Sequence, residues 1–203
     1  MILLVVCGID ANDKVIPLAW ALVPIENEVW WTWFLGYLKH CIPALSMEYH
    51  IFISDREKGM AAAVPTVFDQ AIYLYCYQHI ADNLQQRYGN KVRPLFWRAC
   101  RAKTRELFYK KIEELKAQSV PAFDYLCNIK KRTWARAYSI YPRYGHDTSN
   151  TVESLNSLWS DIRCLPPLQM MDAIYSIAMK TVYDRSNQEQ KLDFIADVPI
   201  AKF

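Results

Sequence analysis

The stretch Ile51-Phe52-Ile53-Ser54-Asp55-Arg56-Glu57-Lys58-Gly59 decides how the rest of the sequence is interpreted. Apolar, β-prone residues end in a carboxylate, a charged turn with a glycine follows, and a helix-like run begins at Met60. A strand held by its sheet fixes the Asp55 carboxylate, which suits an acidic metal ligand because little freedom is lost on binding. The alternative, equally compatible with this stretch, is that Asp55 caps the following helix, since Asp is a favoured N-cap residue.

Length and composition predict an ordered protein. With 203 residues, 52% of them hydrophobic, the chain can bury a core as one domain or as one domain with an insertion. No apolar run reaches the ~18 residues that span a bilayer. The apolar start, Met1 to Cys7, lacks a basic region and is interpreted as a strand and not as a signal peptide. Six scattered cysteines are typical of reduced thiols. We therefore expect an intracellular protein that is not secreted and has no transmembrane segment.

The positive charge is concentrated in one part of the chain. Between Arg87 and Arg136, fourteen Lys or Arg residues stand against four Asp or Glu, a balance of +10; the rest has ten against seventeen, a balance of −7, which gives the overall +3. A basic segment in an acidic frame indicates a polyanionic partner. The alternative is a set of helices with solvated basic faces.

The N-terminal part predicts two strands joined by a turn. Leu3–Cys7 and Val15–Val23 are apolar runs, and Asp10–Asp13 between them has turn chemistry, so Asp10 is interpreted as a turn residue. The second run is apolar almost throughout, which predicts burial on both faces under covering helices. Pro17 within it predicts a bulge or an edge.

Aromatic residues dominate the helix expected after Glu26-Asn27-Glu28. Acidic residues suit the first turn of a helix because they complement its dipole. The helical period predicts a core-facing stripe. Its members are Trp30, Trp33, Phe34, Tyr37, Leu38 and Cys41.

Cys76 and His79 stand where a further strand, Ala71–Cys76, gives way to a helix over 78–87. A lone Cys-x-x-His is half of a zinc site, and a buried Cys beside a polar His is the favoured interpretation. His79 nevertheless follows the C-terminal end of a strand, where the sites of open α/β sheets collect.

From Lys91 to about Tyr138 the pattern is helical throughout, with Thr104 and Ser119 as helix starts. This predicts a helical insertion between two parts of an α/β domain. The expected division is residues 1–88 for the first part of the core, 89–140 for the basic helical insertion, 141–185 for the closing helices and 186–203 for a weakly patterned tail.

Glu153 lies 98 positions after Asp55 and early in a predicted helix that Ser149 or Asn150 can cap. Its carboxylate can simply complement the helix N-terminus. The functional alternative is a second metal-binding carboxylate that the fold brings to Asp55. A closing helix is expected over about 168–183.

Taken in order, several stretches resemble the transposase domain of Mutator-like elements, which are cut-and-paste DNA transposases. They are Gly8-Ile9-Asp10-Ala11-Asn12, Pro17-Leu18-Ala19, Glu26-Asn27-Glu28 with Trp31-Thr32-Trp33-Phe34-Leu35, Ile53-Ser54-Asp55-Arg56-x-Lys58-Gly59, Ala63-Val64-Pro65, Tyr75-Cys76-x-x-His79, Leu95-Phe96-Trp97-x-Ala99, Trp134-Ala135-Arg136-Ala137-Tyr138 and Asn150-x-x-Glu153-Ser154-x-Asn156. The ordered set is specific and covers nearly the whole chain.

The resemblance implies an α/β fold of the ribonuclease-H-like type: a mixed sheet flanked by helices, with an all-helical insertion before the last catalytic helix. It implies an Asp, Asp, Glu set that holds Mg²⁺ or Mn²⁺, in which Asp55 matches the second member and Glu153 the third. Cys76, His79, Asn150 and Asn156 would lie near that site. The first Asp of the family stands upstream of the run that begins here at Ile2, so we expect this chain to be N-terminally truncated and to lack it.

The expected function is therefore that of a DNA transposase catalytic domain. Hard cations prefer oxygen ligands, and two of them can activate water or a 3′-hydroxyl for phosphodiester displacement. The expected partner is DNA, both the transposon ends and the target, and the expected location is the nucleus. A homo-oligomer stays possible. Neither a membrane nor a small-molecule substrate is expected. The basic segment would contact the DNA backbone. Its named candidates are Arg98, Arg101, Arg105 and Lys110.

Two other functions stay open at this stage. One is a catalytically inactive, transposase-derived protein that binds DNA or regulates transcription. The other is an unrelated interaction protein of mixed helices and strands.

Overall fold

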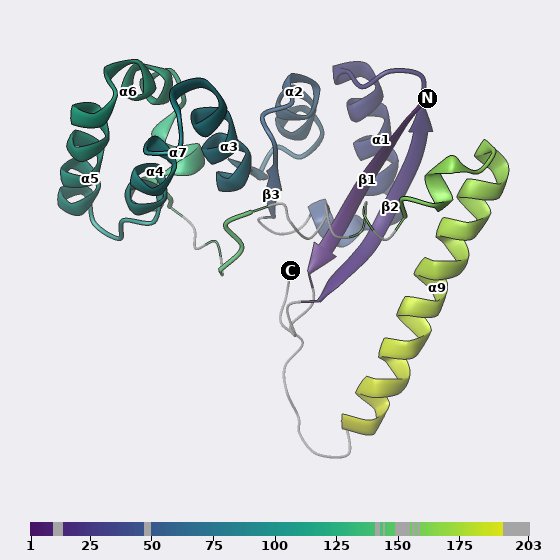
Figure 1. The fold of residues 1–203 in the computed structure, drawn as a ribbon. Helices are drawn as coiled ribbons and strands as arrows, with labels where there is room; N and C mark the ends of the chain where they lie inside the picture. Colours follow the sequence, from purple (N-terminus) through teal and green to yellow (C-terminus); the bar gives the residue numbers. More distant parts are fainter. Residues whose placement is uncertain are drawn as a thin grey trace. The chain divides into compact units, whose positions relative to one another are not determined.

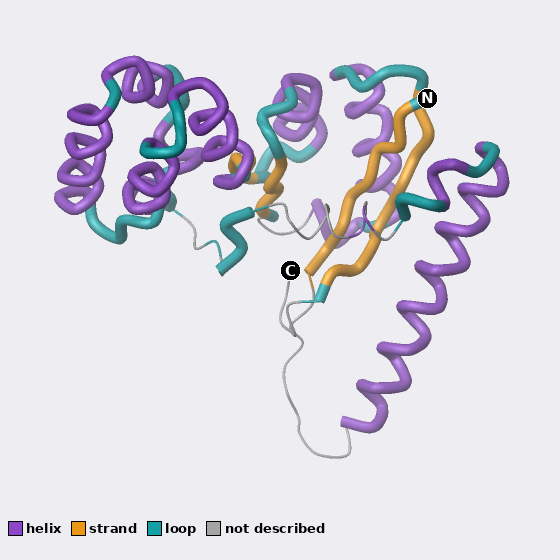
Figure 2. The backbone as a smooth tube through the Cα atoms, in the orientation of Figure 1, coloured by secondary structure: helices purple, strands orange, loops and turns teal. Residues whose placement is uncertain are grey.

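Residues 1–9, 14–46, 50–140, 143, 145–148, 155, 157 and 159–192 are described by the computed structural model of this protein, with side chains up to residue 186. Helices and two small sheets alternate along the chain, which confirms the predicted α/β class (Figure 1, Figure 2). The chain forms two units, residues 1–26 with 150–203 and residues 27–149.

The first unit contains the predicted pair of strands. β1 (Ile2–Ile9) and β2 (Val15–Val23) are antiparallel. The register shifts between Val6 and Cys7, which pair with Ala19 and Pro17, so Leu18 between these two has no partner. Proline cannot donate to a ladder, and the bulge predicted from Pro17 is therefore confirmed. The turn expected at Asp10–Asp13 lies outside the described residues.

One face of this sheet packs against helix α9 (Pro167–Leu192) and the short 3₁₀ helix η3 (Ile162–Cys164). Trp159 is fully buried there, with its ring 6.4 Å from that of Trp20. Leu4 and Val23, on the opposite face, are buried as well, in agreement with the prediction of burial on both faces. The closing helix was expected to end near residue 183; it continues to Leu192.

Helix α1 (Glu28–Cys41) opens the second unit. Asn27 caps it, accepting a hydrogen bond of 3.0 Å from the amide of Trp30. The predicted core stripe is correct for Phe34 and Leu38, which are buried, and wrong for Trp33 and Tyr37, which are 44% and 60% exposed. The buried residues follow the same helical period on a neighbouring face. They are Trp31, Phe34, Leu35 and Leu38.

Helix α2 (Lys58–Val67) packs on α1 at very short range. A Cβ at Gly59 would lie 2.6 Å from the backbone carbonyl carbon of Asn27 and 2.6 Å from the amide of Glu28. Only glycine permits this approach, which explains the residue that closes the Asp55 stretch. The 3₁₀ helix η1 (Pro43–Ser46) follows α1.

The second sheet consists of β3 (Ile51–Ser54) and β4 (Ile72–Tyr75). They are parallel, with Ser54 beside Tyr75, and α2 forms the crossover between them. Helix α3 (Tyr77–Tyr88) starts immediately after β4. The strand ends that carry Asp55 and Cys76 therefore meet at one edge of this sheet.

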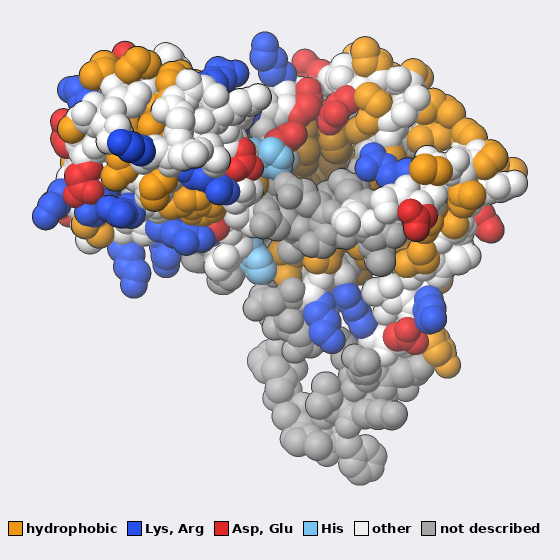
Figure 3. Space-filling model, in the orientation of Figure 1, with side chains coloured by type: hydrophobic (Ala, Val, Ile, Leu, Met, Phe, Trp, Pro, Cys, Tyr) orange, Lys and Arg blue, Asp and Glu red, His pale blue; other side chains and the backbone are white. Residues whose placement is uncertain are grey.

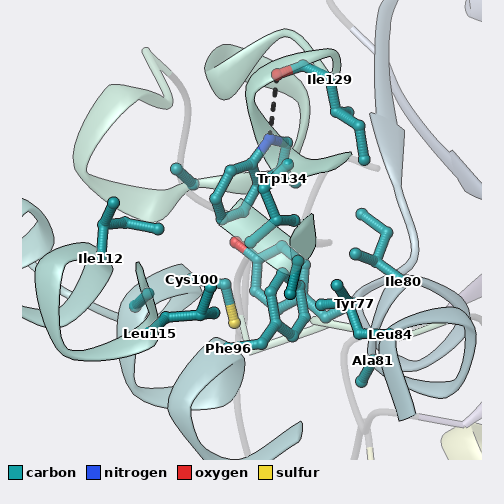
Figure 4. Packing of buried hydrophobic residues seen from close by; sticks show 14 of the residues in the cluster. Tyr77, Ile80, Ala81, Leu84, Phe96, Cys100, Ile112, Leu115, Ile129 and Trp134 are labelled. Carbon is teal, nitrogen blue, oxygen red and sulfur yellow. Dashed lines mark hydrogen bonds between the residues drawn. The ribbon is translucent and has the colours of Figure 1, made fainter. Parts of the chain in front are cut away.

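The helices predicted from Lys91 to Tyr138 are confirmed as α4 (Val92–Cys100), α5 (Arg105–Gln118), α6 (Val120–Cys127), α7 (Lys131–Trp134) and the 3₁₀ helix η2 (Arg136–Tyr138). Thr104 and Ser119 cap α5 and α6 as expected. The buried core of these helices also includes α3 through Tyr77, Ile80 and Leu84 (Figure 4).

Trp134 stands at the centre of this core and donates a hydrogen bond of 3.3 Å to the carbonyl of Ile129 (Figure 4). Among the described residues, no helix is long and apolar enough to cross a membrane. The domain boundaries and the ribonuclease-H-like arrangement of the sheets stay predictions.

Candidate functional site

Asp55 follows the last residue of β3, and its side chain is exposed. Its backbone carbonyl accepts hydrogen bonds from the hydroxyl of Ser54 at 2.7 Å and from that of Tyr73 at 3.1 Å. Burial raises the pKa of Tyr73, so this hydroxyl stays protonated and can donate. The Asp55 carboxylate therefore projects from an anchored backbone, as predicted for a strand-end ligand.

The alternative interpretation of Asp55, as the N-cap of the following helix, is wrong. Helix α2 begins at Lys58, and Glu57 is its cap, accepting a hydrogen bond of 2.7 Å from the amide of Met60. One Asp55 carboxylate oxygen accepts from the amide of Glu57 at 3.3 Å, which stabilises the turn between strand and helix. Because Glu57 caps the helix, the exposed carboxylate of Asp55 stays available to a ligand.

Cys76 and His79 lie at the same sheet edge. The amide of Cys76 donates to the carbonyl of Ser54 at 2.7 Å, so Cys76 directly neighbours the end of β3. Its side chain is fully buried, and His79 lies partly buried in the first turn of α3. A thiolate is a soft ligand that suits neither Mg²⁺ nor Mn²⁺. Within the described ranges, no three His, Cys, Asp or Glu side chains form a group that could hold a metal ion.

A buried arginine holds a return segment of the chain against this edge. Arg143 is 8% exposed, and its guanidinium donates to the backbone carbonyls of Tyr75 at 3.1 Å and Thr133 at 2.8 Å. The guanidinium lies 3.9 Å from the centre of the Tyr77 ring. Burial lowers the pKa of Arg143 by penalising the charged form. These contacts join the end of β4, the start of α3 and helix α7.

Asp147 continues the same anchor. Its backbone carbonyl accepts from the amide of Tyr77 at 3.0 Å, and its carboxylate pairs with the guanidinium of Arg101 at 3.0 Å. The segment in which the sequence predicts a helix with Glu153 follows Asp147 in the chain. Asp147 therefore ties this part of the chain to the start of α3 and to the end of α4.

The four predicted DNA-contacting residues of the helical part are all exposed. Arg98 and Lys110 lie on α4 and α5. Arg105 places its guanidinium 5.1 Å from the Tyr138 ring. Arg101 is partly neutralised by Asp147. Lys and Arg side chains gather over these helices in the view of Figure 3.

Four residues of interest lie outside the described residues: Glu153, Asn150, Asn156 and the turn residue Asp10. The pairing of Glu153 with Asp55 therefore stays a prediction.

For three residues of this edge the sequence predicted no role at the site: Tyr73, Glu57 and Arg143. Tyr73 was predicted only as part of a strand, and the alternation of β4 could have placed it beside Tyr75 on one face. Glu57 could have been recognised as a rival cap. Arg143 stands in a loop without any periodicity, so no sequence signal marked it.

The described residues thus form an α/β protein in which the exposed carboxylate of Asp55 stands at the end of a parallel strand. Residues 1–83 match the family model of the MULE transposase domain, and the resemblance to Mutator-like transposases is confirmed over this range. The match includes Asp55, Cys76 and His79. No curated protein matches the chain at a significant level. The domain suggests a transposase-related function, implies DNA as a partner, and suggests dependence on divalent metal in general.

Proposed function

We propose that this chain is part of the catalytic domain of a DNA transposase, which carries out metal-dependent cleavage and strand transfer, and that Asp55 is one of its metal-binding carboxylates. The observation that carries the proposal is the position of Asp55. It lies within the matched domain, at the end of a parallel strand, with an anchored backbone and an exposed side chain. Glu57 caps the neighbouring helix, so Asp55 is not needed for that structural role.

The residues fit a hard divalent cation. Carboxylate oxygens are the ligands that Mg²⁺ and Mn²⁺ prefer, and in our proposal Asp55 and Glu153 supply them together. A cation held by these carboxylates would supply positive charge for the leaving oxygen of a phosphodiester and would favour a deprotonated nucleophile. The task of the chain is to hold the carboxylates still. The hydroxyls of Ser54 and Tyr73 hold the backbone carbonyl of Asp55, and the amide of Glu57 donates to one oxygen of its carboxylate.

We propose further that Glu153, six residues after Asp147, supplies the second carboxylate. Asp147 itself is held next to the start of α3, because its carbonyl accepts a hydrogen bond from the Tyr77 amide.

Titration of the metal-free protein with Mn²⁺, followed by the electron spin resonance signal of free Mn²⁺, tests the metal site. We expect Asp55→Asn and Glu153→Gln each to weaken binding at least tenfold, about 1.4 kcal/mol. Asp69→Asn is the matched control, because it makes the same change at an exposed Asp in the turn before β4, at the amino end of that strand and not at the carboxyl ends that carry Asp55 and Cys76. Unchanged Mn²⁺ affinity in Asp55→Asn would refute the role of Asp55.

The second candidate function is that of a catalytically inactive, transposase-derived protein that binds DNA. The basic helices α4 to α7 favour it, because backbone contacts by exposed Arg and Lys need no catalysis. A nicking assay on supercoiled plasmid with Mg²⁺ or Mn²⁺ distinguishes the two. Nicking that Asp55→Asn abolishes supports the enzyme, whereas DNA binding that is independent of metal and without nicking supports the second candidate.

A further inference from the structure

Two arginines near Asp55 converge on one tyrosine. Arg56, the residue after Asp55, donates from its guanidinium to the hydroxyl of Tyr125 on α6 at 2.5 Å and lies 5.3 Å from the centre of that ring. It also lies 5.9 Å from the ring of Tyr75, at the end of β4. Arg87, in the last turn of α3, lies 5.4 Å from the same Tyr125 ring. The two positive charges thus share one aromatic side chain.

Within the described residues, no ion pair joins either arginine of this Arg56–Tyr125–Arg87 cluster to a carboxylate. Both arginines are exposed. In the described part of the chain, the ion pairs join Arg93, Arg101 and Lys111 to acidic partners, and neither arginine of the cluster is among them. A guanidinium that stacks on a ring keeps its remaining N–H donors in a fixed plane, which reduces the entropy lost on binding an anion.

We propose that Arg56 and Arg87, oriented by Tyr125, form a phosphate-binding site for the DNA backbone beside Asp55. This inference rests on the proposed function and deepens it, because it assigns backbone contacts to the sheet edge as well as to the basic helices α4 and α5. Guanidinium groups match the geometry of phosphate oxygens and form the stronger, charge-assisted hydrogen bonds.

The position of Arg56 in the chain links the proposed phosphate site to Asp55. Arg56 directly follows Asp55, and their Cα atoms are about 3.8 Å apart, so the proposed phosphate contact starts from the residue next to that carboxylate. Tyr125 belongs to helix α6, whose Leu126 is part of the core that the helices share with α3. The cluster therefore fixes the DNA backbone relative to the strand end through residues of a single unit.

The test is the salt dependence of duplex DNA binding by the whole chain. Each phosphate contact contributes about 0.9 to the slope of log K against log salt concentration. We expect Arg56→Gln and Arg87→Gln each to reduce the slope by about 0.9, and the double variant by about twice that. Arg93→Gln is the matched control, because Arg93 already pairs with Asp82 at 3.1 Å. We expect it to leave the slope nearly unchanged.

Further variants separate binding from a merely structural role. Arg56→Lys retains the charge, so we expect it to restore most of the slope that Arg56→Gln loses. Tyr125→Leu retains both charges but removes the ring, so we expect weaker binding with a nearly unchanged slope. Urea unfolding of each variant measures stability independently.

The outcomes are distinguishable. If the wild-type chain binds DNA and the Arg56 and Arg87 variants retain its slope while losing only stability, the cluster is structural and this inference is overturned, while the proposed function stands. If the wild-type chain has no affinity for DNA, the proposed function and this inference both fail.

Discussion

Replacing Arg143 by Met should destabilise the second unit more than any surface change near the site. Met is of similar length and is apolar, so it fills the space without a charge. The carbonyls of Tyr75 and Thr133 then lose their guanidinium donor. The contact with the Tyr77 ring, at 3.9 Å, loses its cationic part.

The magnitude follows from these contacts. A fully buried carbonyl left without a partner costs about 1–3 kcal/mol; these two hydrogen bonds are part-buried, so the two carbonyls together cost about 2–3 kcal/mol. The lost interaction with the ring adds about 2 kcal/mol. Against this, the variant no longer has to bury a charge, a penalty visible in the lowered pKa of Arg143. We therefore expect a net loss of about 2–4 kcal/mol.

Hydrogen exchange measured by mass spectrometry suits this prediction, because it reports the opening of individual segments. For peptides that cover β4 and the start of α3, the free energy of opening should fall by the same amount as the free energy of unfolding measured with urea. Arg101→Gln is the control: its ion pair with Asp147 is exposed and should contribute less than about 1 kcal/mol. A loss below about 0.5 kcal/mol in Arg143→Met would refute the view that this arginine anchors the return segment.

Three further predictions concern single side chains. Glu57→Ala should cost about 1 kcal/mol in urea unfolding through the lost cap, whereas Asp55→Asn should change stability by less than about 0.5 kcal/mol; equal effects would contradict the assignment of the cap. Phe108→Ala, at a fully buried position, should cost about 3–5 kcal/mol, and a loss under 1 kcal/mol would show that this core is loosely packed. Burial raises the pKa of the Cys100 thiol, so at pH 8 Cys100 should react with a disulfide reagent only after the protein unfolds, whereas the exposed Cys127 should react in the folded protein. Mass spectrometry of the modified peptides measures both rates, and equal rates would contradict the burial of Cys100.

The strand end at Asp55 could be predicted because an apolar run stops abruptly at a charged residue. The identity of the helix cap could not. Asp55 and Glu57 both offer a carboxylate near the helix start, and the choice depends on the backbone of Glu57, whose φ of −63° and ψ of 128° place it just outside the helix. Sequence patterns report periodicity and not such single dihedral angles.

The face of α1 shows a second limit. Aromatic residues occupy four of five consecutive positions from Trp30 to Phe34, so two neighbouring stripes satisfy the same helical period. Packing on α2 at Gly59 selects the stripe that contains Trp31, which buries this ring and leaves Trp33 exposed. That selection depends on a tertiary contact, which periodicity alone does not contain.

The role of Arg143 could not be predicted from the sequence, and its contacts show how the elements around the candidate site are held together. Its acceptors are carbonyls 68 and 10 positions earlier in the chain, so its role arises only from the folded arrangement. Through it, the end of β4 and helix α7 share one buried cation. Helix α3 starts at that same edge, and its buried face belongs to the core around Trp134. The basic helices are therefore packed onto the element that begins beside Asp55, so a phosphate bound there, as we propose, would be held relative to that carboxylate. A transposase site needs that fixed relation between DNA backbone and metal ligand, since in-line displacement demands aligned reacting oxygens.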